Sequence, residues 1–76
     1  MSLRNQIITL IAKIYDVEEN QINDNSSFEG NLQGNERQFL ELVMACEEEF
    51  DMIVRAADVD NFLTVGAFIR YLESFH

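Results

Sequence analysis

Apolar residues recur with the spacing of one helix face in three stretches of the chain. The first stretch runs from Leu3 to Tyr15, with Ser2 as a candidate N-cap. The second runs from Glu36 to Phe50, and the third from Val65 to about Phe75 behind Thr64 as a cap. The residues predicted to face the core are Leu3, Ile7, Leu10, Ile11 and Ile14 in the first stretch, Phe39, Leu42, Val43, Cys46 and Phe50 in the second, and Val65, Phe68, Ile69, Leu72 and Phe75 in the third.

The second helix carries the clearest start signal. Asn35 followed three residues later by Gln38 is the spacing of a capping box, in which each side chain satisfies the other residue's backbone N–H. A weaker pattern predicts a short helical turn from Ala56 to Asp60. Because no stretch alternates with a period of two, the sequence predicts an all-α fold. We expect one domain, residues 1–76, built as a bundle of three main helices plus one short helix.

The segment from Asp16 to Gly34 is long for a loop in so small a domain. Its apolar residues are spread along it, and Asn, Asp, Ser and Gly between them favour turns. We therefore expect the loop to be pinned onto the helices rather than free. The predicted anchors are Val17, Ile22, Phe28 and Leu32.

A second stripe of residues lies on the side of the second helix opposite its core face. Leu40 and Met44 are one helical turn apart there, with acidic residues around them. Adaptable hydrophobic side chains inside a charged rim are typical of a docking surface. The alternatives are that the loop covers Leu40, or that both are ordinary surface hydrophobes. The stripe consists of Arg37, Leu40, Glu41, Met44 and Glu48, with Glu36 and Glu47 at its flanks.

The charge balance narrows the class of partner. The chain has 5 basic and 14 acidic residues, a net charge of −9. Nucleic acids and anionic membranes bind through Lys and Arg, so both are disfavoured, as is membrane insertion. A strongly acidic surface favours basic protein surfaces as partners. We expect the free protein to be monomeric.

The compartment is indicated only indirectly. Cys46 is the single cysteine, which excludes an internal disulfide and favours a reducing environment. The chain has no apolar run of roughly 18 residues and no signal-peptide layout at its start. The expected localisation is cytoplasmic.

Residues for catalysis or metal binding are scarce. His76, the only histidine, is the last residue, and Cys46 lies on a predicted core face. One Cys and one His cannot form a zinc site. Residues 23–27, NDNSS, lack the glycine and glutamate of a calcium loop, and the three glycines form no phosphate-binding pattern. We expect no metal and no enzymatic activity.

Residues 41–50, ELVMACEEEF, resemble the acyl carrier protein signature ELVMALEEEF. The loop before them, with Asn25-Ser26-Ser27-Phe28 and then Asn31-Leu32, is similar to the family's first loop. Thr64-Val65-Gly66 resembles the start of its last helix. The resemblance extends over essentially the whole chain. It implies the acyl-carrier-protein bundle with its long first loop and its acidic second helix.

One part of the family pattern is missing. Family members have Asp-Ser-Leu at the start of the second helix, where the serine takes 4′-phosphopantetheine, but this chain has Asn35-Glu36-Arg37. Glu36 has no hydroxyl and cannot form the usual phosphodiester, so we expect no 4′-phosphopantetheine. The loop ahead of it also differs, with Gln33 where the family has glycine. Ser26 and Ser27 lie in that loop, away from the position that the modifying enzyme recognises, and we do not expect them to be modified.

The resemblance and its gap lead to a main hypothesis and two alternatives. The main one is a non-catalytic docking module for biosynthetic or acyl-handling enzymes, acting through the acidic second helix. The alternatives are a genuine carrier in fatty-acid or polyketide-type biosynthesis with a variant attachment site, and a permanent structural subunit. Glu36 is either a helix-start acid favoured by the dipole or a charge that imitates the missing phosphodiester. The residues that would line an acyl-sized cavity, or else form ordinary core, are Ile11, Val43, Phe62 and Phe68.

Overall fold

The computed structural model describes residues 2–30, 32, 34–55, 58 and 62–74, and within these ranges three α-helices and one 3₁₀ turn have both ends described. The elements are α1 (Leu3–Tyr15), η1 (Glu19–Gln21), α2 (Glu36–Glu49) and α4 (Val65–Glu73). The described residues contain no strand, and the all-α prediction is confirmed. Of the predicted turn at 56–60 only Asp58 is described, and it is helical; the other four residues and Phe75 lie outside the described residues.

The three helix starts are capped as the sequence predicts. The Ser2 side chain accepts a hydrogen bond from the backbone N–H of Asn5, and that of Thr64 accepts one from the N–H of Ala67. At α2 the Asn35 side chain accepts from the N–H of Gln38 at 2.9 Å, and the Gln38 side chain accepts from the N–H of Asn35 at 3.0 Å. These caps satisfy backbone donors that have no partner inside the helix.

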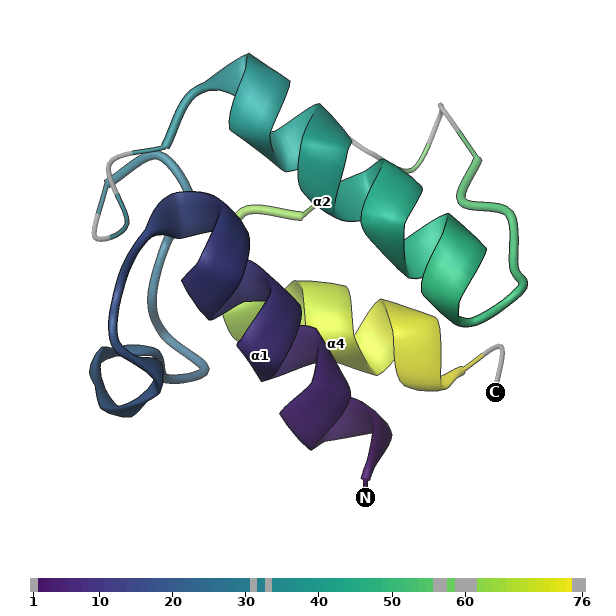
Figure 1. Ribbon diagram of the computed structural model, residues 1–76, viewed down its shortest axis with the longest axis horizontal. Helices are drawn as coiled ribbons and strands as arrows, with labels where there is room; N and C mark the ends of the chain where they lie inside the picture. The colour runs from purple at the N-terminus through teal and green to yellow at the C-terminus, as the bar shows by residue number, and fades with distance from the viewer. Residues whose placement is uncertain (1, 31, 33, 56–57, 59–61, 75–76) are drawn as a thin grey trace.

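The core lies between the helices, with α2 above α1 and α4 in the view of Figure 1. α1 packs against both α2 and α4. A cluster of contacting rings, with centroids between 5.1 and 6.4 Å apart, is formed by Phe28, Phe39, Phe62 and Phe68. The buried apolar residues of the helices are Ile7, Ile11 and Tyr15 in α1, Leu42, Val43 and Cys46 in α2, and Val65, Phe68, Ile69 and Leu72 in α4.

The described residues of the predicted core faces all pack against the core, but their burial differs from the pattern in two ways. Phe39 and Phe50 are only half-buried, because they lie at the two ends of α2, where fewer neighbours cover them. In α1, Leu3, Leu10 and Ile14 are half-buried too, whereas Tyr15, which the pattern did not place in the core, is buried. The tyrosine ring packs against Phe28 from the loop, with centroids 5.8 Å apart.

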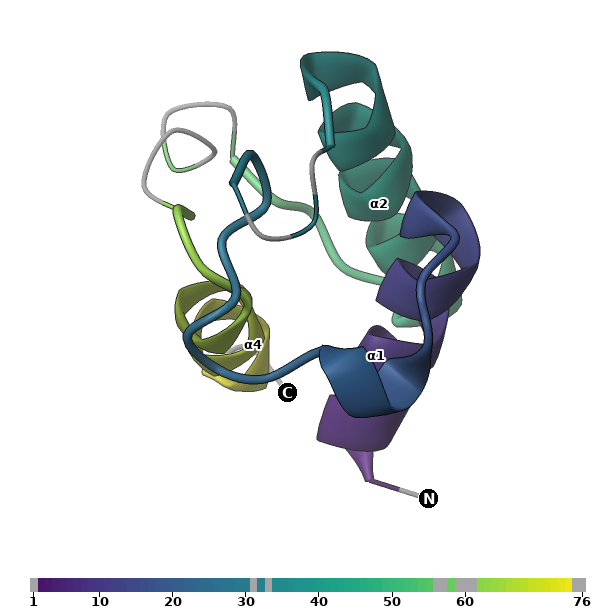
Figure 2. The ribbon, with the colours of Figure 1, turned by 90° about the vertical axis from the view of Figure 1, so that its left-hand side faces the viewer.

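The loop between α1 and α2 is anchored as expected, and it also caps α4 (Figure 2). Ile22, Phe28 and Leu32 are buried, and Val17 is half-buried. The backbone N–H of Val65 donates to the carbonyl of Ser26 at 2.9 Å, and the N–H of Gly66 donates to that of Asp24 at 3.0 Å. The loop therefore supplies acceptors to the first turn of α4.

Gly66 makes this contact possible. A Cβ at this position would come within 2.9 Å of the Asp24 carbonyl oxygen, which is closer than side chains tolerate. Arg4 on α1 forms an ion pair with the Asp24 side chain, so the same loop residue is held from two helices.

No helix in the described part of the chain is long and apolar enough to cross a membrane.

Candidate functional site

The outer face of α2 carries two exposed hydrophobic side chains. Leu40 is 46% exposed and Met44 is 66% exposed. The loop therefore does not cover Leu40, and that alternative from the sequence is wrong. Because the two residues are four positions apart, their side chains lie on the same face, one above the other.

Charged residues surround this pair. Glu36, Arg37, Glu41 and Glu48 are all exposed on α2. The Arg37 Nε lies 3.4 Å from a carboxylate oxygen of Glu41, an exposed pair one turn apart. Such a pair contributes at most a few tenths of a kcal/mol to stability, roughly 0.3–0.5. It leaves both groups free to exchange partners with an approaching surface.

Glu47, at the flank of the stripe, has a structural contact that the sequence did not indicate. It is half-buried, and its carboxylate accepts a hydrogen bond from the backbone N–H of Val54 at 2.8 Å. This contact holds the segment after α2 against the helix. Met44 and Glu48 are thus the more accessible residues of the stripe's second half, and Glu47 is partly engaged within the protein.

Glu36 is the first residue of α2, and its side chain is exposed. The capping pair of Asn35 and Gln38 fixes the helix start around it. A carboxylate in the first turn is favoured by the helix dipole, by about 0.3–1 kcal/mol. It offers charge and hydrogen-bond acceptors but no nucleophilic hydroxyl.

The two serines of the preceding loop already serve local structure. Ser26 is only 3% exposed, and its hydroxyl oxygen accepts from the N–H of Asn23 at 3.1 Å. The Ser27 hydroxyl oxygen accepts from the N–H of Gly30 at 2.9 Å. Ser27 lines a surface pocket that the start of α2 also lines, whereas Ser26 lines a different one.

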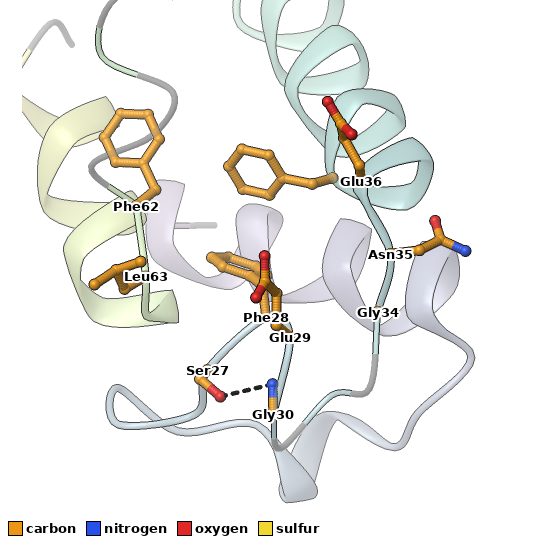
Figure 3. A pocket seen from close by; sticks show the side chains of 10 residues that line it. Ser27, Phe28, Glu29, Gly30, Gly34, Asn35, Glu36, Phe62 and Leu63 are labelled. Atoms are coloured by element: carbon orange, nitrogen blue, oxygen red, sulfur yellow. Dashed lines mark hydrogen bonds between the residues drawn. The ribbon is translucent and has the colours of Figure 1, made fainter.

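That pocket, of about 530 Å³, opens beside the start of α2 (Figure 3). Three segments surround it: the loop at 27–30, the start of α2, and residues 62–63 ahead of α4. Its volume lies in the range of ligand pockets. The lining residues are Ser27, Phe28, Glu29, Gly30, Gly34, Asn35, Glu36, Phe39, Phe62 and Leu63.

The pocket is not formed by the residues that the sequence suggested for an acyl-sized cavity. Ile11 and Phe68 are 0% exposed, and Val43 and Phe62 are buried as well, so these four residues belong to the core. Only Phe62 among them also reaches the pocket. Sequence reasoning did not single out Glu29 or Leu63, because no spacing rule connects them with α2.

The thiol of Cys46 is enclosed in the core. Burial first, and the nearby Glu47 and Glu49 carboxylates second, raise the pKa of Cys46 to about 12. Such a thiol stays protonated and unreactive near neutral pH. Within the described ranges no three His, Cys, Asp or Glu side chains are grouped to hold a metal ion; His76 lies outside them.

Comparison with known proteins places most of the chain in one family. The family described as "Phosphopantetheine attachment site" matches residues 5–72. The acyl carrier protein of Chlamydia felis (strain Fe/C-56) is 32% identical over 74 residues, which cover 97% of this chain and 95% of that protein. The acyl carrier protein of Buchnera aphidicola subsp. Schizaphis graminum is 32% identical over 73 residues, covering 96% and 92% respectively.

Proposed function

The chain belongs to the acyl carrier protein family, and we propose that it acts in that family as a docking module without a phosphopantetheine arm. It binds biosynthetic or acyl-handling enzymes through the outer face of α2 and catalyses no reaction itself. The observation that carries the proposal is the exposed pair Leu40 and Met44, which lies within an acidic rim on a helix that starts with Glu36.

The partner surface is basic. The net charge of −9 gives a long-range attraction that speeds encounter with a positive patch, while Leu40 and Met44 supply apolar contact once it is docked. Because the contacts of charged rims are screened by salt, this association weakens steeply as ionic strength rises. A permanent structural subunit, in contrast, would stay bound at high salt.

Glu36 has a specific part in this proposal. It corresponds by resemblance to the serine that carries the arm in the family, and its single negative charge imitates the phosphodiester found there. A partner with a cation at that point then recognises the domain without cargo. Replacing Glu36→Gln removes the charge and keeps the shape, so unchanged partner affinity would exclude this role.

The experiment that tests the missing arm is a modification assay. The purified protein is incubated with a phosphopantetheinyl transferase and coenzyme A, and its intact mass is measured. We expect no change in mass, with an ordinary acyl carrier protein in the same tube as the positive control. A gain of one phosphopantetheine arm would overturn the proposal.

A genuine carrier with a variant attachment site is the second candidate. Two observations favour it: the relatives are acyl carrier proteins, and the Ser27 hydroxyl lies on the pocket beside α2. If the mass assay shows an arm, peptide mapping together with Ser27→Ala identifies whether this serine holds it.

A further inference from the structure

The charges on the outer face of α2 follow an order along the helix. Arg37 is exposed in the first turn, Leu40 and Met44 follow, and Glu48 is exposed in the last turn. Their positions are three or four residues apart, so the side chains line up on one side of the helix. This docking face, formed by Arg37, Leu40, Glu41, Met44 and Glu48, therefore has a cation at its start, apolar contacts in its middle and a carboxylate at its end.

The stability of the helix does not explain this order. The start of a helix carries a partial positive charge and its end a partial negative one, so a cation at the start and carboxylates at the end are both disfavoured. Arg37 is the second residue of α2, Glu48 and Glu49 are its last two, and its last turn contains no basic residue. The docking face thus carries, at each end, a charge that the helix itself disfavours, which indicates a use outside the helix.

Arg37 is accessible to a second anion. Its side chain is 88% exposed, and its Nε lies 3.4 Å from a carboxylate oxygen of Glu41, whose own side chain is 54% exposed. A cation one turn ahead of a carboxylate is the weaker of the two possible orders for such a pair. A guanidinium has five N–H donors, so it can bind another carboxylate without giving up the first. Arg37 is also the only basic residue of α2.

We propose that Arg37 selects the partner of the docking face: the surface that fits it is basic opposite Glu48 and carries an acidic residue opposite Arg37. The inference rests on the docking function proposed above. A uniformly basic surface would place a cation against Arg37, and like charges in contact across an interface weaken binding. Because the sign of the charge changes along α2, it also fixes the direction in which the partner lies on the helix.

The neighbouring Glu36 does not cancel this requirement. Consecutive residues of a helix point roughly 100° apart. Glu36 lines the pocket beside the start of α2, whereas Arg37 is not among the residues that line it. A partner therefore meets the two charges at different places, with a cation at Glu36 and an anion at Arg37.

The test uses two synthetic helical peptides as probes, so that no native partner is needed. Both have a leucine stripe. The first has arginines along the whole rim, and the second has glutamates in place of the arginines at one end but keeps a net positive charge. Binding is measured by calorimetry at low salt. Compared with the unsubstituted protein, Arg37→Gln should bind the all-arginine peptide roughly two- to fivefold more tightly and the mixed peptide roughly two- to fivefold more weakly.

Arg70→Gln is the matched control, because it removes an exposed cation from α4 and changes the net charge equally. This variant becomes more attractive to any positive peptide, so it should not weaken binding of the mixed one. Opposite changes for the two peptides in Arg37→Gln alone support the inference. A change in the same direction for both peptides overturns it.

The docking function is judged separately with the same peptides, by Leu40→Ala and Met44→Ala. If these variants weaken binding while Arg37→Gln moves both peptides in one direction, the docking face stands and selection by Arg37 is rejected. If neither peptide binds the unsubstituted protein, or if neither alanine variant weakens binding, the docking function is rejected and the inference with it.

Discussion

The ring of Tyr15 lies directly against the backbone of Gly34, so that a Cβ at position 34 would come 2.1 Å from the tyrosine Cε2. This approach joins the end of α1 to the loop just before α2. The N–H of Gly34 donates to the carbonyl of Phe28 at 2.9 Å, which fixes the loop at the same point. A glycine is thus needed here for space.

The substitution Gly34→Ala should lower the free energy of unfolding by about 1–3 kcal/mol, because the buried ring must move. Urea unfolding measures this loss. Gly30→Ala is the matched control, since its Cβ would meet the Ser27 hydroxyl, at 2.5 Å, and rotating that side chain away gives up the exposed hydrogen bond from the Gly30 N–H but moves no buried ring. An equal loss in both variants would mean that the contact with Tyr15 is not the cause.

Tyr15→Phe should stabilise the protein by about 1 kcal/mol, because the buried hydroxyl of Tyr15 has no hydrogen-bond partner among the described residues. Thermal or urea unfolding measures the gain. Tyr71→Phe is the contrasting variant: the Tyr71 hydroxyl donates to the Asp58 carboxylate at 2.8 Å, so its removal should destabilise. If Tyr15→Phe is the destabilising one, its hydroxyl has a favourable contact after all.

Stability should fall at alkaline pH because of Cys46. Burial raises the pKa of Cys46 to about 12 in the folded protein, against a usual value of 9.0, so the unfolded chain loses this proton first. The contribution is complete below about pH 9 and is lost as pH rises toward 12, at roughly 1.4 kcal/mol per pH unit. Urea unfolding across this range measures the slope. The variant Cys46→Ala should be less stable at every pH, and its free energy of unfolding should change less with pH between about pH 9 and 10. An unchanged slope would assign the effect to another group.

Leu40→Ala and Met44→Ala should leave the free energy of unfolding within about 0.5 kcal/mol of its original value, because both side chains are exposed. The same variants should weaken binding to a basic partner enzyme, measured by calorimetry. Ile53→Ala is the control, since Ile53 is 82% exposed but lies outside α2. A loss of stability without a loss of binding would argue against a docking face.

The triple variant Asn35→Asp, Glu36→Ser and Arg37→Leu should accept a phosphopantetheine arm, because it restores the attachment sequence on an intact helix. Intact-mass analysis after incubation with the transferase and coenzyme A measures this gain. The single variant Glu36→Ser separates the hydroxyl from its neighbours. If the triple variant stays unmodified, the rest of the surface no longer suits the transferase.

Local features of the fold could be predicted from the sequence. The caps at Ser2, Asn35 and Thr64 depend on residues within one helical turn, so the helix starts are found where expected. Burial at helix ends could not be predicted in the same way. Whether Tyr15 is covered depends on where the loop runs, and helical spacing contains no information on that.

For the same reason the docking face could be predicted from the sequence and the pocket could not. Leu40 and Met44 are related by one helical turn, so their shared exposed face follows from spacing. The pocket brings Glu29 from a loop, Glu36 from a helix start and Leu63 from a connecting segment. Only the tertiary fold places these three side chains around one opening.

The carbonyl groups of Asp24 and Ser26 lie where the first turn of α4 needs acceptors for its N–H groups. A helix of nine residues is too short to persist alone in water, so α4 depends on its packing in the core and on the distant loop laid against its first turn. The irregular stretch and the last helix should therefore melt together, in one cooperative step, although a long part of the sequence lies between them.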